Sequence, residues 1–448
     1  MKKILIQNVH VVFGHIPGRK ADVLIVDELI SQIGKPNSVN SSGAVIIDGT
    51  GKYLFPGLID DQVHFREPGL THKAEIYTEA KAAVAGGVTS YMEMPNTSPP
   101  ATTIQLLEDK YNIARGRSLA NYSFYMGTTN DNFDELLKVD PKKVCGVKIF
   151  MGSSTGNMLV DSPECLEKIF ANIKMLIATH CEDEVLMKMN LGKTIAKYGE
   201  NYLTAVFHPI IRDHGVCYSS SAFAVQLAKK YGTRLHVLHI STANELKLFR
   251  NDIPLMEKKI TAEACVHHLY FSDKDYETLG NLIKCNPAIK TEQDREAIFN
   301  AVLDDLIDVI ATDHAPHTWD EKSQLYTKAP SGIPLVQHSL NLMLEFAIAG
   351  KISKQKIVEK MCNNPAIMFD IDRRGFIKEG YFADLVLVDM DKHYTVGKEN
   401  ILSKCSWSPF EGKRFHSVIT HTFVNGHLAY DNGHFNEYKM GKRLEFNR

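Results

Sequence analysis

The sequence predicts an α/β protein: a closed (β/α)8, TIM-like barrel joined to a small β-sandwich domain that both ends of the chain build. Three observations support this fold. The 448 residues exceed one ordinary domain of roughly 100–200 residues. The middle of the chain alternates eight apolar runs with helical patterns, and both ends contain only short β-rich runs. We therefore divide the chain into an N-terminal part of the small domain at 1–55, the barrel at 56–375, and a C-terminal part of the small domain at 376–448.

Short strands are predicted at both ends because Val and Ile are frequent there and Gly and Asp interrupt them. The predicted strands lie at residues 4–13, 21–26, 44–48, 383–389, 417–424 and 427–430. Asn425-Gly426, between the last two, is typical of a type I′ hairpin turn, because both residues tolerate positive φ angles. Neither end has enough strands to be stable alone, so we expect the two ends to pair.

The barrel strands are predicted from eight apolar runs, which lie at residues 58–64, 89–94, 122–126, 145–150, 176–180, 235–239, 260–265 and 309–312. Helical patterns fill several of the intervals, at 74–85, 219–231 and 292–303. Eight strand–helix units predict a closed parallel barrel with its active-site residues at the carboxyl ends of the strands. An open doubly wound sheet is the alternative, but no Gly-x-Gly-x-x-Gly follows an early strand.

Composition excludes several classes of function. Lys and Arg number 51 against 53 Asp and Glu, a net charge of −2, so we expect no nucleic-acid partner. No apolar run approaches the roughly 20 residues of a membrane helix, and no signal-peptide core follows the first lysines. The eight cysteines are scattered without a Cys-x-x-Cys pair, which favours a cytoplasmic protein and argues against a thiolate zinc site.

Side chains of metal-binding type lie in or directly after five of the predicted strands, and they are His64, Lys148, His180, His239 and Asp313. A single histidine at a strand end is most often a packing residue. Five such positions on five strands of a barrel converge on one mouth, however. Imidazole and carboxylate are ligands that zinc prefers, so this pattern predicts a metal site.

Lys148 lies between Val147 and Ile149, where a buried charge is costly. One interpretation is that its side chain extends to solvent or pairs with an acid. The other is that it is held neutral and takes up CO₂ as a carbamate, which can bridge two metal ions. The sequence leaves both open.

Five short motifs run through the chain, and they are Pro56-Gly57-Leu58-Ile59-Asp60, Phe65-Arg66-Glu67-Pro68-Gly69, Pro95-Asn96-Thr97, Lys284-Cys285-Asn286-Pro287 and Asp313-His314-Ala315-Pro316-His317. Together they resemble the amidohydrolase superfamily, and within it the class I dihydroorotases. The resemblance covers nearly the whole chain. It implies a zinc-dependent, reversible cyclisation of N-carbamoyl-L-aspartate to (S)-dihydroorotate with loss of water, in de novo pyrimidine (UMP) biosynthesis, and it suggests a homodimer.

The resemblance also implies roles for individual residues. Positions 62 and 64 with Asp313 would hold one metal, His180 and His239 the second, and a carboxylated Lys148 would bridge the two. Asp313 would also be the catalytic proton carrier. The implied substrate-binding residues are Arg66, Asn96, Asn286, His317, Ser331 and Gly332. The family has Phe-Gly where Ser331-Gly332 stands in this chain.

Arg66 distinguishes dihydroorotases from the similar allantoinases and dihydropyrimidinases, which lack this arginine. Dihydroorotate carries a ring carboxylate, onto which a guanidinium forms two parallel hydrogen bonds. Hydantoin and dihydrouracil have no such group. The plainer alternatives are a loop salt bridge for Arg66 and turn or capping roles for Asn96 and Asn286.

Gln62 departs from the family pattern, which has histidine at this position. A neutral amide oxygen is a poorer zinc ligand than imidazole. Three consequences are open: two metals bind and activity persists, one zinc remains, or the chain is a non-catalytic homologue that scaffolds aspartate transcarbamoylase. Because the other five ligand positions are kept, we favour an active enzyme.

Overall fold

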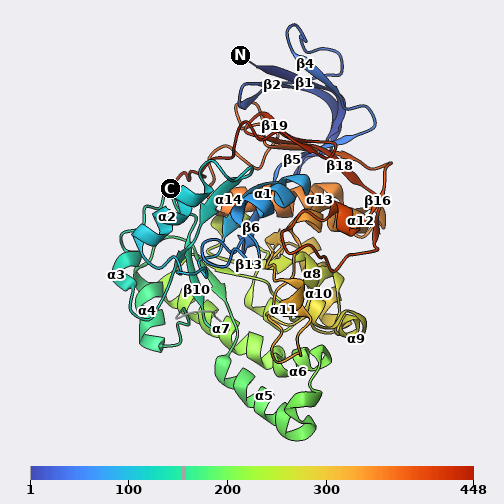
Figure 1. Cartoon of the computed structure of the whole chain (residues 1–448). Coiled ribbons are helices and arrows are strands. Elements are labelled where there is room, and N and C mark those ends of the chain that lie inside the picture. Colours follow the sequence, from blue (N-terminus) through green and yellow to red (C-terminus); the bar gives the residue numbers. More distant parts are fainter. Residues whose placement is uncertain (1, 153–157) are drawn as a thin grey trace.

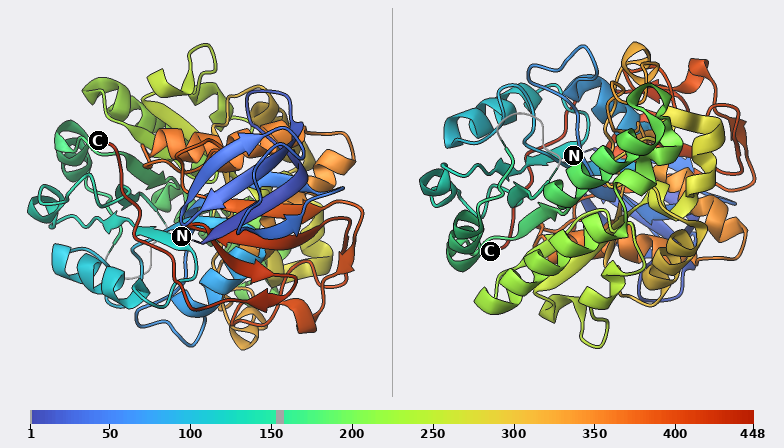
Figure 2. Two further views of the ribbon diagram at one scale, coloured as in Figure 1. Left: turned by 90° about the horizontal axis from the view of Figure 1, so that it is seen from above. Right: turned by 90° about the horizontal axis from the view of Figure 1, so that it is seen from below.

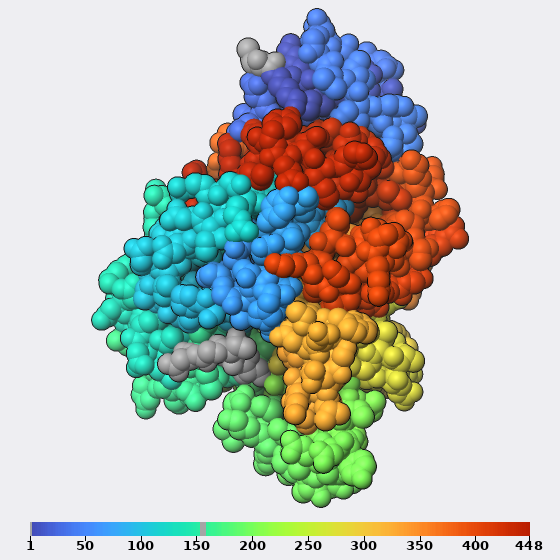
Figure 3. All heavy atoms as spheres, viewed as in Figure 1, coloured from blue at the N-terminus to red at the C-terminus, as the bar shows by residue number. Residues whose placement is uncertain are grey.

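The computed structural model describes residues 2–152 and 158–448 and contains a barrel beneath a small sheet domain (Figures 1 and 3). The predicted fold class is confirmed. The barrel strands are β6 (Leu58–Val63), β7 (Val88–Glu93), β8 (Asn121–Phe124), β9 (Met126–Gly127), β10 (Val147–Phe150), β11 (Ile177–His180), β12 (Leu235–Val237), β13 (Ile260–Cys265) and β14 (Val309–Ala311).

Eight parallel barrel strands arise because β8 and β9 are two halves of one strand that is interrupted at Tyr125. One run of pairing joins β6, β7 and β8, and another joins β9 through β14. A parallel bridge between Val63 and His314 connects β6 to the end of β14 and closes the ring. All eight predicted strand positions therefore hold a barrel strand.

Helices surround the barrel and fill the intervals between its strands. They are α1 (Ile76–Ala85), α2 (Ile104–Ala114), α3 (Phe133–Leu136), α4 (Pro163–Asn172), α5 (Glu184–Tyr198), α6 (His208–Ile211), α7 (His214–Tyr231), α8 (Val266–Tyr270), α9 (Tyr276–Leu279), α10 (Glu292–Leu303), α11 (Trp319–Lys322), α12 (Ser339–Ile348), α13 (Lys354–Val358) and α14 (Asn364–Met368).

Local sequence explains where the helices begin and end. Thr291 starts α10 with a reciprocal capping box to Asp294, so the predicted range 292–303 is matched. Helix α7 begins five residues earlier than predicted, because the Asp213 side chain caps it by accepting from the Val216 N–H. It ends at Gly232 in the left-handed conformation. Among the described residues, no helix is long and apolar enough to cross a bilayer.

Both ends of the chain build one nine-stranded sheet, in which the blue N-terminal strands lie beside the red C-terminal strands (Figure 2, left). Its strands are β1 (Lys3–Val11), β2 (Arg19–Val26), β3 (Leu29–Gly34), β4 (Val45–Asp48), β5 (Tyr53–Pro56), β15 (Leu385–Asp389), β18 (Val418–Val424), β19 (His427–Asp431) and β20 (His434–Phe435). β16 (Tyr394–Thr395) and β17 (Arg414–Phe415) form a separate pair.

The two halves of this sheet share one apolar core, which includes Ile6 and Val23 from the first half and Leu385 and Phe423 from the second. β5 joins them, because it pairs parallel to β1 and antiparallel to β15. The predicted hairpin turn is confirmed, since Asn425 and Gly426 have φ angles of 51° and 71°. Strands β3 and β5 were not predicted, because they are short and carry polar residues or Pro.

The last residues of the chain leave the small domain and pack on the base of the barrel, at the amino ends of its strands. Leu444 donates its N–H to the Tyr122 carbonyl, and Arg443 pairs with Glu108 of α2. Leu444 and Phe446 are buried in an apolar cluster with barrel residues. The predicted range 376–448 therefore includes a segment that contacts the barrel directly.

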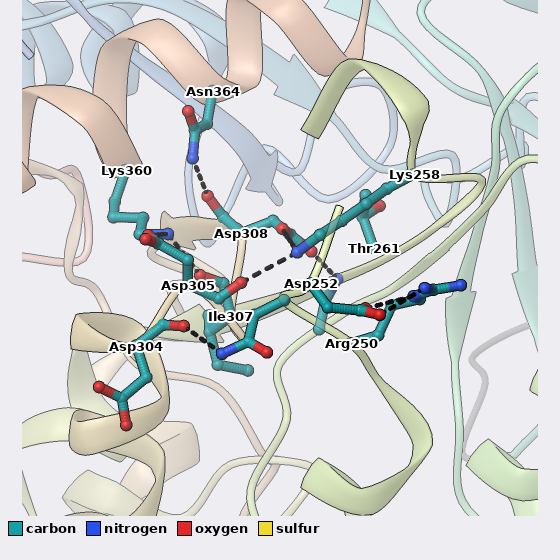
Figure 4. A network of polar contacts seen from close by, with 12 residues as sticks. Arg250, Asp252, Lys258, Thr261, Asp304, Asp305, Ile307, Asp308, Lys360 and Asn364 are labelled. Atoms are coloured by element: carbon teal, nitrogen blue, oxygen red, sulfur yellow. Dashed lines mark hydrogen bonds and ion pairs between the residues drawn. The ribbon is translucent and has the colours of Figure 1, made fainter. Parts of the chain in front are cut away.

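Buried charges at the base are paired (Figure 4). Lys258 Nζ lies 2.7 Å from Asp308 Oδ1, and Asp308 Oδ2 accepts from the Ala262 N–H of β13. Lys360 donates to Asp305 Oδ1 and to the Ile307 carbonyl. These contacts fix the start of β13 and β14 against the segment between α13 and α14.

Candidate functional site

A pocket of about 340 Å³ opens at the carboxyl ends of the barrel strands. We call it the mouth pocket, and its lining includes Gln62, His64, Arg66, Asn96, Lys148, Phe150, His180, Arg212, His239, Asn286, Asp313, His317, Ser331 and Gly332. The structure thus brings every residue that was predicted for the site, from segments far apart in sequence, to the wall of one pocket.

His180 and His239 form one ligand-type pair. His180 Nδ1 lies 2.9 Å from His239 Nε2, and His180 Nε2 lies 3.0 Å from a Glu182 carboxylate oxygen. Since Glu182 accepts the Nε2–H, the lone pair of Nδ1 faces His239. Burial alone raises the pKa of Glu182, but the charge of Arg212 and the His180 hydrogen bond lower it to about 2, so this acceptor stays ionised. The pair is pre-oriented for a cation.

His64 and Asp313 form the second pair. His64 Nδ1 lies 2.9 Å from Asn96 Oδ1, which makes Nδ1–H the donor and leaves the Nε2 lone pair 3.1 Å from Asp313 Oδ1. Two electron-rich atoms at this distance require a proton or a metal ion between them. Burial raises the pKa of Asp313, yet His64 more than compensates and the pKa is lowered. The donor set therefore fits a divalent metal.

Gln62 presents its amide donor to the same carboxylate. Its Nε2 donates to Asp313 Oδ1 at 3.0 Å, while its Oε1 lies 3.9 Å from Cys265 Sγ. In this orientation Gln62 supports Asp313 as a hydrogen-bond donor and does not direct a ligand atom at the His64–Asp313 pair.

Lys148 is 1% exposed, and within the described residues its Nζ has no hydrogen-bond partner. It lies 4.6 Å from the centroid of the Phe150 ring. The Lys148 side chain does not extend to solvent, and it forms no ion pair with the described residues. Burial lowers its pKa to about 8, although Asp313 and Glu263 oppose the shift. A buried amine of lowered pKa has the neutral form that reacts with CO₂.

Arg66 lines the same mouth pocket. Its Nε donates to the Pro316 carbonyl at 3.0 Å, and its Nη2 lies 3.0 Å from His317 Nε2. It is 7% exposed and has no ion pair with a carboxylate in the described chain, so the loop salt bridge is not formed. Burial lowers the pKa of Arg66 to about 10, which leaves it cationic at neutral pH. An unneutralised guanidinium in a pocket is a site for an anion.

The loop that carries Ser331 and Gly332 is fixed by a buried lysine that the sequence did not indicate. Lys322 Nζ donates to the carbonyls of Lys284, Pro330 and Gly332. Gly332 has a φ of 146°, and a Cβ there would collide with the Ala315 carbonyl, so glycine is required. Asn286 Oδ1 lies 3.1 Å from His208 Nε2.

Two further residues of the site were not predicted, Glu182 and Arg212. They follow the fifth strand and α6, outside any motif. Their role is indicated only by the contact of Glu182 with His180 and by Arg212, which pairs with Glu182 and lines the pocket. Three site residues, Arg66, His239 and Asp313, have positive φ angles of 70°, 40° and 48°. Such backbone strain in non-glycine residues is typical of functional sites.

Comparison with known proteins agrees with this geometry. The model of the amidohydrolase family matches residues 53–429. The dihydroorotase of Methanosarcina acetivorans is 34% identical over 405 residues, which cover 88% of this chain and 85% of that protein. The dihydroorotase of Thermoanaerobacter sp. (strain X514) is 32% identical over 441 residues, 96% of this chain and 97% of that protein.

Solved structures with the same fold include the L-hydantoinase (dihydropyrimidinase) of Arthrobacter aurescens, with a TM-score of 0.89 and 25% identity. That alignment covers 97% of this chain and 98% of the hydantoinase. The dihydropyrimidinase of Brevibacillus agri NCHU1002 has a TM-score of 0.88 at 23% identity, with both chains covered completely.

Proposed function

The chain belongs to the amidohydrolase family, and we propose that it is a dihydroorotase. Such an enzyme interconverts N-carbamoyl-L-aspartate and (S)-dihydroorotate, with water lost on ring closure, in de novo pyrimidine biosynthesis. The observation that carries the proposal is the buried guanidinium of Arg66, which has no ion pair among the described residues and lines the same pocket as four ligand-type side chains. That arrangement suits a small cyclic amide that bears a carboxylate.

The proposed cofactor is zinc, held at the mouth by His64, Lys148, His180, His239 and Asp313. The facing nitrogen and oxygen atoms of the two pairs support this ligand set. Lys148, buried without a hydrogen-bond partner, would be carboxylated and bridge two ions. Because Gln62 points its donor at Asp313, the His64–Asp313 side would bind its ion more weakly. Bound zinc supplies Lewis acidity to the reacting carbonyl and to the attacking water.

The remaining roles, substrate binding and proton transfer, would fall to side chains and backbone of the mouth pocket. Arg66, Asn96 and Asn286, with His317 close by, would hold the substrate carboxylate, and the 331–332 backbone would contact the substrate. In hydrolysis Asp313 would accept a proton from water as its oxygen attacks the ring amide carbon. The C–N bond then breaks, and Asp313 returns that proton to the leaving nitrogen. In ring closure the same steps run in reverse.

Two other functions have specific observations behind them. Dihydropyrimidinase or allantoinase activity would suit the structural relatives, but neither class of substrate has a carboxylate for Arg66. A non-catalytic subunit that scaffolds aspartate transcarbamoylase would be consistent with Gln62. The four other ligand side chains and Lys148 all face the pocket, however, which favours catalysis.

We further propose a homodimer in the cytoplasm. All eight cysteines are free, as they would be in a reducing compartment. An aspartate transcarbamoylase remains the candidate protein partner, to be sought by copurification.

The decisive experiment is turnover of dihydroorotate by purified, zinc-replete protein, followed by the ultraviolet absorbance of the ring amide. Saturable hydrolysis is expected, with hydantoin and dihydrouracil as control substrates that lack the carboxylate. Faster turnover of either control would replace the proposal with the dihydropyrimidinase-type reaction. No turnover by folded, zinc-loaded protein would favour the scaffold function.

A further inference from the structure

Inside the barrel, three buried side chains form a cluster that no predicted ligand belongs to. Asp61 comes from β6, His236 from β12 and Glu263 from β13, and each is 0% exposed. One ligand atom from each of the three lies within 4.8 Å of the others. We call them the interior triad, and the proposed reaction uses none of them.

The imidazole of His236 is oriented by its neighbours. Its Nδ1 lies 2.8 Å from Thr261 Oγ1, and the Thr261 hydroxyl donates to the Leu235 carbonyl. The hydroxyl proton is therefore engaged, and Nδ1–H must be the donor to Oγ1. This leaves Nε2 as the atom that faces the two carboxylates.

Nε2 lies close to both carboxylates. It lies 3.1 Å from Asp61 Oδ2 and 3.7 Å from Glu263 Oε2, but neither contact has hydrogen-bond geometry. A protonated His236 in a simple ion pair would direct its N–H at one oxygen. Ligands of a tetrahedral zinc at about 2.0–2.2 Å lie about 3.3–3.5 Å apart, and the two observed separations bracket that value.

The carboxylates of the interior triad also lack most of their hydrogen bonds. In the part of the chain that the structure describes, neither oxygen of Asp61 has a hydrogen-bond partner, nor has Glu263 Oε2. Glu263 Oε1, in contrast, accepts from the His239 N–H at 2.9 Å. Two carboxylates removed from water require positive charge nearby. A divalent cation neutralises both while His236 stays neutral, and one nitrogen with two oxygens is a donor set that suits zinc or manganese.

We propose that Asp61, His236 and Glu263 hold a divalent metal ion inside the barrel, separate from the metal site at the mouth. Because Glu263 also binds the backbone of His239, the interior ion positions the strand end that carries this mouth residue. The interior triad thus acts on the mouth through structure, without contacting the substrate.

The test is the zinc content of purified protein by mass spectrometry after dialysis against zinc and then against buffer. Asp61→Asn is expected to bind one zinc per chain fewer than the unchanged protein. Asp22→Asn is the matched control, since Asp22 is equally buried but lies in the small sheet domain, and its zinc content should stay the same. Equal zinc in Asp61→Asn and the unchanged protein would overturn the proposal.

A second measurement covers the case in which Asp61→Asn does not fold. Crystals of the unchanged protein grown with zinc should show an anomalous peak bounded by Asp61, His236 and Glu263, and no peak there would overturn the proposal. His180→Ala separates the two sites, because it should lose mouth zinc and dihydroorotate turnover while the interior peak persists. If the interior peak disappears together with the mouth zinc in His180→Ala, the interior residues do not hold an ion of their own. That result would also overturn the proposal.

Discussion

Lys258 and Lys148 are two buried lysines of the barrel, one at its base and one at its mouth. Lys258 Nζ contacts the Asp308 carboxylate and the Asp305 carbonyl (Figure 4). Lys148 is 1% exposed, against 3% for the Lys258 side chain, but its Nζ has no hydrogen-bond partner among the described residues. The same residue type therefore serves stability where its charge is paired, and remains available for chemistry where it is not.

The largest effect is expected from Lys148→Ala. If Lys148 is the carbamate that bridges the mouth metals, the variant should lose bound zinc and fall in kcat by about 1,000-fold or more, which corresponds to about 4 kcal/mol. Metal analysis and steady-state turnover measure both. Partial rescue by a short carboxylic acid is expected, and full retention of zinc would contradict the bridging role.

Lys258→Met tests the ion pair at the base of the barrel. It leaves Asp308 buried without its cation, and the loss of one partner of a buried pair is expected to lower the free energy of unfolding by about 3 kcal/mol. Lys148→Met is the matched variant at the mouth. In metal-free protein it should leave the stability unchanged or slightly raised, since no pair is lost. Urea denaturation measures the free energy of unfolding of both variants. An equal decrease in the two would contradict the difference proposed between the paired and the unpaired lysine.

Arg66→Ala tests the second unpaired charge of the mouth pocket. Loss of charge-assisted hydrogen bonds to the substrate carboxylate should raise KM for dihydroorotate about 10- to 100-fold at normal zinc content. Arg117→Ala is the control, because Arg117 is already paired with Glu67 and Glu75 and lies outside the pocket lining. An unchanged KM in Arg66→Ala would exclude carboxylate binding by this residue.

The smallest effect concerns a paired carboxylate outside the mouth, Asp294. Burial raises its pKa, but hydrogen bonds from His214, the Ala243 N–H and Thr291 lower it to about 2. A folded-state pKa below the unfolded value stabilises the protein above about pH 4, and this contribution is lost as the pH falls towards 2. Asp294→Asn should therefore cost at most about 2 kcal/mol at pH 7. Its stability should converge with that of the unchanged protein near pH 2, and a gap that persists there would contradict the pairing.

The sequence predicted the barrel because each strand is an apolar, β-branched run of adequate length. It did not reveal the break at Tyr125 or the short strands β3 and β5, where tertiary pairing decides the conformation. Most of the mouth residues could be predicted because they belong to motifs or lie in or at the end of a strand.

The remaining polar residues could not be predicted, for two physical reasons. Glu182 and Arg212 come from separate segments that meet only in the folded chain. Asp61 and Glu263 lie within strands, where a single sequence does not show which charged side chains turn inward or what they will meet.

The position of β5 between β1 and β15 has a consequence for synthesis on the ribosome. β5 emerges early, but its antiparallel neighbour emerges only after the whole barrel has been made. Until then one edge of the N-terminal strands is open, with unpaired N–H and C=O groups that can bind other nascent chains. Closing this edge joins residues that are several hundred positions apart, which makes it a slow, late event. The open edge of β5 is therefore most exposed to wrong pairing before the second end of the chain has arrived.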